Sequence, residues 1–116
     1  MPQEEKISHA LSVLLEAEVP EGSPLAEYKA ALDFIVIGWG ISLLDADKRF
    51  EALQDFAATI AGTDDAIRRE ALGHIERLIA RKQALFPHDK RTIVSWDAGF
   101  HGDSVRVSAA ALAPSP

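Results

Sequence analysis

Residues 34–44 (FIVIGWGISLL) form the most apolar stretch of this chain, and no charged residue interrupts it. Asp33 and Asp45 bound it on either side. As an α-helix this stretch would be roughly 16 Å long, whereas the hydrocarbon layer of a membrane is ~30 Å thick. The stretch is therefore too short to span a membrane. We interpret it as a buried helix around which the rest of the chain packs.

Residues 34–38 are also typical of a β-strand, because three of them, Ile35, Val36 and Ile37, are β-branched. We prefer the helix because the preceding residues are strongly helical and no turn signal separates the two segments. Trp39 is expected in the core. Glycine in a helix costs ~1 kcal/mol relative to alanine, so we expect Gly38 and Gly40 to permit close approach of another helix. Leucine at either position should then overpack the contact.

Four segments carry apolar residues at three- and four-residue spacings, which is the pattern of amphipathic helices. Proline and glycine separate the first two segments and end others. Thr63 is the expected N-cap of the last helix. The predicted helices cover residues 3–18, 24–45, 48–61 and 64–85.

The pattern changes after Pro87. Residues 92–96 and 104–108 alternate with period two, and residues 97–103 between them include two glycines. This predicts a β-hairpin over 92–108 with a long loop, followed by a frayed tail at 109–116. An isolated hairpin is only marginally stable, so it must pack on the helices, pair with a second copy or receive a partner's strand. The predicted fold is mainly α (α+β): one domain, 1–116, resembling a four-helix bundle with a C-terminal hairpin.

Charge and composition restrict the class of protein. The chain has a net charge of −6, with 13 acidic and 4 basic residues in 1–66 but 5 acidic and 8 basic residues in 67–116. An acidic chain is a poor general binder of nucleic acid, whereas an uneven charge can steer a protein partner. The absence of cysteine excludes disulfides, thiolate metal sites and a cysteine nucleophile. It suits the cytoplasm, our predicted location, and no signal peptide or cofactor motif is visible.

The residues that could carry chemistry lie mostly after Pro87. Histidine and carboxylate side chains are suitable metal ligands. One hypothesis is therefore a small metal-dependent hydrolase whose ligands are His88, Asp89, His101 and Asp103. Their spacing matches no known metal signature, and turns favour Asp and Gly for their backbone chemistry alone.

The leading hypothesis is a small non-enzymatic interaction protein, such as an immunity protein, antitoxin, inhibitor or adaptor. It would bind a protein partner or self-associate. Exposed aromatic residues often anchor such contacts, and basic residues end the last predicted helix. The candidate partner-binding residues are Trp96, Phe100, His101, Arg77 and Arg81.

A helical DNA-binding regulator is a further alternative. Residues 61–63 form a short turn between two predicted helices, as a helix-turn-helix requires. However, the second of these helices opens with Asp64 and Asp65, at the place where phosphate or base contacts would be needed.

Overall fold

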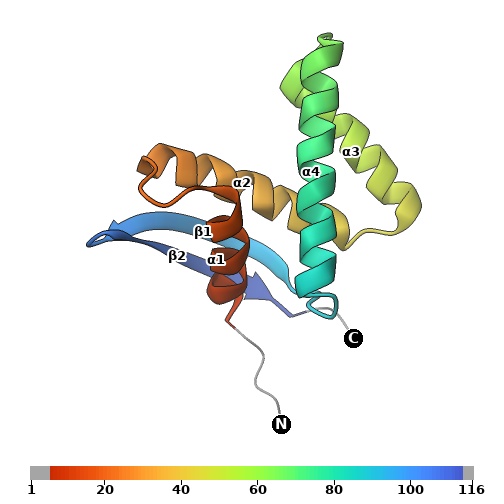
Figure 1. Cartoon of the computed structure of the whole chain (residues 1–116). Coiled ribbons are helices and arrows are strands. Elements are labelled where there is room, and N and C mark those ends of the chain that lie inside the picture. The colour runs from red at the N-terminus through yellow and green to blue at the C-terminus, as the bar shows by residue number, and fades with distance from the viewer. Residues whose placement is uncertain (1–5, 114–116) are drawn as a thin grey trace. The chain divides into compact units, whose positions relative to one another are not determined.

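The computed structural model describes residues 6–113, which contain four helices and a two-stranded antiparallel sheet (Figure 1). The mainly α fold with a C-terminal hairpin is thereby confirmed. Residues 3–5 and 114–116 of the predicted elements lie outside the described part. Among residues 6–113 no helix combines the length and apolar character that crossing a membrane requires. The elements are α1 (Ile7–Glu18), α2 (Leu25–Ser42), α3 (Ala46–Ala61), α4 (Asp65–Leu85), β1 (Thr92–His101) and β2 (Ser104–Leu112).

The chain divides into two compact units, and the prediction of one domain stays a prediction. The first unit is Met1–Val36 with His88–Pro116, and the second is Ile37–Pro87. The first therefore contains α1 and the hairpin, and the second contains α3 and α4. The boundary falls within α2, which contributes residues to both.

In the first unit, α1 packs its apolar face against β2. Leu11, Leu14 and Leu15 of this face are at most 2% exposed. Full burial of a leucine side chain contributes about 1.5–3 kcal/mol, so this face is a major source of the unit's stability. The turn after α1 is tied to α2, because the Tyr28 hydroxyl donates to the Pro20 carbonyl at 3.1 Å.

The hairpin turn is much shorter than predicted. His101 pairs with Ser104, so only Gly102 and Asp103 form the loop. Gly102 has a φ of 66°, whereas Asp103 has a negative φ, since no non-glycine residue of the described chain has a positive one. A positive φ at the first of the two loop residues only is the pattern of a type II′ turn. The prediction of a loop over 97–103 is wrong because Ala98 and Gly99 obscure an alternation that continues through these residues.

Strand β2 also continues further than predicted. It runs to Leu112, so the prediction of a frayed tail is wrong for residues 109–112. Its small residues carry no alternating pattern, yet they are paired with β1 as far as the Thr92–Leu112 pair. The pairing partner, rather than the local sequence, makes this segment a strand.

The register gives the hairpin two different faces. Residues directly opposite each other point to the same side of a sheet. Beyond a register shift between Ile93 and Ser95, one face contains Trp96, Ala98 and Phe100, opposite Ala109, Val107 and Val105. Ala98 and Val107 are buried, so this face meets the helices. The other face is exposed or half-exposed and consists of Ser95, Asp97, Gly99, His101, Ser104, Arg106, Ser108 and Ala110.

In the second unit, Trp39 is the largest fully buried side chain, at 1% exposure. Its ring centroid lies 6.1 Å from that of Phe86, and the Lys82 Nζ lies 4.8 Å above it. The buried lysine thus makes a cation–π contact with the indole. The prediction that Trp39 lies in the core is confirmed.

The two glycines beside Trp39 have different surroundings. A Cβ placed on Gly38 would lie 3.3 Å from the Leu78 Cβ, closer than most real contacts of this kind. A Cβ on Gly40 would meet nothing within 4 Å. Gly38 therefore permits the close approach of α4, as predicted, whereas the same prediction for Gly40 is wrong.

We expect Gly38→Leu to destabilise the protein by ~1–3 kcal/mol, because the added side chain must displace Leu78 and the α4 backbone. Gly40→Leu is the matched control. It should be neutral or stabilising by up to ~1 kcal/mol, because leucine favours the helix and the site is open. Urea unfolding followed by circular dichroism measures both. Equal free energies of unfolding for the two variants would contradict this account of α2.

Asp64, and not Thr63, caps α4. Its carboxylate oxygen accepts hydrogen bonds from the backbone nitrogens of Ala66 at 3.0 Å and Ile67 at 3.1 Å. These bonds satisfy two of the donors that every helix leaves unpaired at its N-terminus.

We expect Asp64→Ala to lower the free energy of unfolding by ~0.5–2 kcal/mol through loss of this cap. Thr63→Ala, one residue away, should change it little. The same urea titration compares them, and a larger loss for Thr63→Ala would show that the cap is assigned to the wrong residue.

Candidate functional site

Two aromatic side chains hold the hairpin to the N-terminal half of α2. The Trp96 Nε1 donates to the Asp33 carboxylate at 2.8 Å, and the Phe100 ring meets the Tyr28 ring edge-on, with centroids 6.0 Å apart. Trp96 remains 38% exposed and Phe100 50% exposed. Each ring therefore contributes to the packing of the hairpin and still presents part of its surface to solvent.

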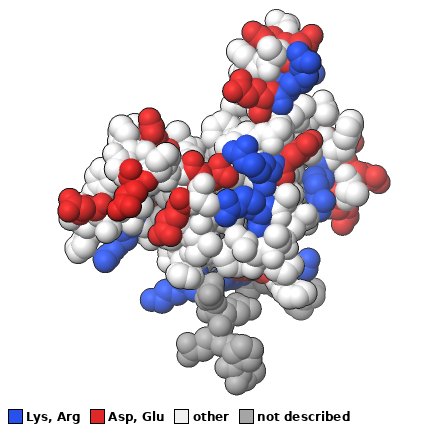
Figure 2. All heavy atoms as spheres, viewed as in Figure 1, with Lys and Arg blue, Asp and Glu red and all other residues white. Residues whose placement is uncertain are grey.

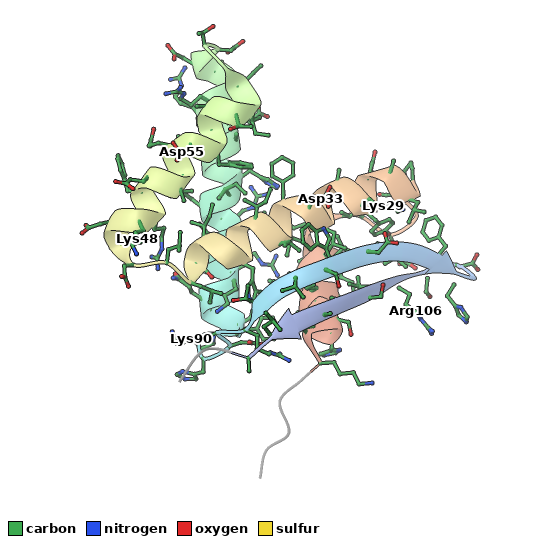
Figure 3. All side chains as sticks on the ribbon, turned by 180° about the vertical axis from the view of Figure 1, so that it is seen from behind. Lys29, Asp33, Lys48, Asp55, Lys90 and Arg106 are labelled. Atoms are coloured by element: carbon green, nitrogen blue, oxygen red, sulfur yellow. The ribbon has the colours of Figure 1, made fainter. Side chains whose placement is uncertain are left out.

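An ion pair adds to this contact at the edge of α2. The Lys29 Nζ lies 3.5 Å from the Asp97 carboxylate, and their side chains are 50% and 70% exposed. Exposed pairs of this kind contribute little, so the aromatic contacts dominate. Figure 3 shows Lys29 and Asp33 on the part of α2 that lies alongside β1.

His101 lies at the end of β1, beside the turn, and lines a groove of about 400 Å³ between α1 and β2. Within the described part of the chain, its lining contains two imidazoles, one guanidinium and three hydroxyls, and no carboxylate. The lining residues are Ser8, His9, Ser12, His101, Ser104, Val105, Arg106 and Val107.

A second groove, of about 380 Å³, lies beside the same end of β2 and has the opposite charge. Three carboxylates line it together with Tyr28 and two valines. Figure 2 shows acidic side chains gathered over the segment that joins α1 to α2, which forms part of this wall. The lining residues are Glu16, Val19, Glu21, Tyr28, Asp103, Ser104 and Val105.

The four predicted metal ligands are not brought together. Asp89 is held by Arg91, whose Nε and Nη2 lie 3.0 and 2.6 Å from its two carboxylate oxygens. His88 and Asp89 precede β1, whereas His101 and Asp103 lie at its far end, a strand length of roughly 30 Å away. Within residues 6–113 no group of three His, Asp or Glu side chains is arranged to hold a metal ion.

The predicted partner-binding residues divide between the two units. Trp96, Phe100 and His101 belong to the hairpin, whereas Arg77 and Arg81 belong to α4. The Arg77 Nη2 lies 2.7 Å from the His74 Nδ1. The hairpin and its two grooves are therefore the site that the first unit offers on its own.

Sequence reasoning missed Arg106, His9 and Ser12 as site residues. The alternation of β2 does place Arg106 on its polar face, but nothing local indicates that α1 lies beside it. No protein-family model, curated protein or solved structure matches this chain. The geometry of the hairpin is therefore the basis for a functional assignment.

We expect the Trp96–Asp33 hydrogen bond to contribute about 1 kcal/mol, less than a buried charged bond because the site is half-exposed. A double-mutant cycle with Trp96→Phe and Asp33→Ala isolates this coupling from other effects of each substitution. The control cycle with Lys29→Ala and Asp97→Ala should give less than ~0.5 kcal/mol. Coupling in the control cycle but not in the first would contradict the assigned roles.

Proposed function

We propose that this chain is a small, acidic, non-enzymatic protein-interaction module, of the general kind that includes immunity proteins, antitoxins, inhibitors and adaptors. The observation that carries the proposal is the exposure of one face and of the strand edges of the hairpin. One of its faces is held by helices, while its other face is open and its two strands have no third strand beside them among residues 6–113. The cytoplasm is the compartment we propose, since a cysteine-free chain suits it.

The outer edge of β2 is the part of the hairpin most suited to a partner. Unpaired strand edges bind other chains unless they are blocked by bulges, charges or proline. Strand β1 has the register shift near Ile93 and the charge of Asp97. Strand β2 has no register shift and no proline, and Arg106 is its only charged residue.

Exposed apolar side chains on the hairpin support the same proposal. Phe100 is 50% exposed, Val94 51% and Leu112 61%. Aromatic residues are enriched among those that dominate binding energy at protein interfaces. The alternatives have less support: the metal ligands are apart, and α4 begins with the carboxylates of Asp64 and Asp65.

Site-specific photo-crosslinking in the cells that produce the protein tests this proposal. A photoreactive amino acid replaces Ser108, at the centre of the open face of β2, or Ala58, an exposed residue of α3 that serves as control. We expect a protein adduct, identified by mass spectrometry, from position 108 and not from position 58. An adduct of twice the chain mass would identify a second copy as the partner. Adducts only from position 58, or from neither position, would contradict the proposal.

A further inference from the structure

We infer that the groove between α1 and the outer edge of β2 receives an extended, acidic segment of a partner protein, which adds to the sheet as a third strand. This inference rests on the proposed function and names the mode of binding and the chemistry of the partner.

The groove runs along the backbone edge of β2. Its lining includes four consecutive residues, Ser104–Val107. Successive side chains of a strand point to opposite faces of the sheet, so consecutive residues can line one groove only where the strand edge itself borders it. The inner edge of β2 is bonded to β1, and no third strand is present in the described chain. The edge that borders the groove is therefore free to pair with a peptide backbone.

The first turns of α1 form the opposite wall. Ser8, His9 and Ser12, whose side chains are polar, line the groove from α1. The Ser12 hydroxyl donates to the Ser8 carbonyl at 2.9 Å, so its oxygen remains able to accept a hydrogen bond from a ligand. This wall is suited to polar side chains of an added strand.

The charge of the groove indicates which side chain an added strand would carry beside Arg106. Among residues 6–113 the lining contains Arg106, His101 and His9 and no carboxylate, although the chain as a whole has a net charge of −6. Arg106 makes no ion pair or hydrogen bond within residues 6–113. Its cross-strand neighbour on β1 is Gly99, which has no side chain to contact it. The guanidinium is thus available to a carboxylate on the other side of β2, as in a favourable cross-strand pair.

A second copy of this chain fits the groove less well. Its β2 would bring another Arg106 and contains no acidic residue to oppose the first. Its β1 offers Asp97, but this strand has the register shift near Ile93. An acidic segment of a different protein is therefore the occupant that the charges favour.

Two matched peptides test the inference by titration into the isotopically labelled full chain, followed by NMR. One is a nine-residue, capped peptide of alternating threonine and valine with a central glutamate; the other has a central lysine. We expect the glutamate peptide to bind about tenfold more tightly, because lysine replaces attraction to Arg106 by repulsion. Its shifts should concentrate at Ser104–Val107 and in the first turns of α1. A glutamate peptide N-methylated on alternate residues of its pairing edge should not bind, since it cannot complete the ladder.

Charge reversal provides the control within the protein. Arg106→Glu should reverse the preference between the peptides, whereas Lys90→Glu, the same change at the other end of the hairpin, should leave it unaltered (Figure 3). Thermal midpoints establish that both exposed variants are folded. Equal binding of both peptides, binding of the N-methylated peptide, or shifts that follow protein concentration alone would overturn the inference. If no peptide binds but position 108 still yields a partner adduct, strand addition is wrong and the interaction role stands. If no peptide binds and position 108 yields no adduct, strand addition and the interaction role are both wrong.

Discussion

One face of the hairpin is held against the helices, by burial of Ala98 and Val107 and by the contacts that Trp96 and Phe100 make with Asp33 and Tyr28. A two-stranded sheet has no second layer of its own, so the face that α1 and α2 cover becomes the inside and the other stays in solvent. The exposure of Arg106 follows from this attachment, whereas the β2 edge is open because no third strand is present among residues 6–113. The proposed binding surface is thus a consequence of how the hairpin is held.

Register is the second constraint on that surface. A slip of one residue would exchange the two faces, because side chains alternate along a strand. The two-residue turn at Gly102 fixes the pairing at one end, and burial of Ala98 opposite Val107 fixes it in the middle. Arg106, one residue from Val107, is thereby kept on the polar face, opposite a glycine. The two-residue turn, which was predicted to be part of a long loop, therefore positions Arg106, the one charged residue of β2.

The helices, the burial of Trp39 and the presence of a hairpin could be predicted from the sequence, because each has a local periodic pattern. The sequence could not show which of several residues with the same pattern makes a given tertiary contact. Residues two apart on a helix point about 200° apart, so Gly38 and Gly40 could not both face α4, yet only the tertiary structure shows which one does. The groove lined by Arg106 was not predictable, because it forms where α1 lies beside a strand about 90 residues later in the chain.

The two grooves at the end of β2 differ in charge, and this difference favours one orientation of the proposed third strand. They share Ser104 and Val105 but differ in charge, with Arg106 on one side and Glu16, Glu21 and Asp103 on the other. At physiological ionic strength charges are screened over ~8 Å, so each groove acts mainly on the part of a ligand next to it. A strand with an acidic residue beside Arg106 and a basic residue toward the turn would satisfy both grooves. The reversed strand would place like charges together at both, so the charge pattern favours one orientation of the added strand.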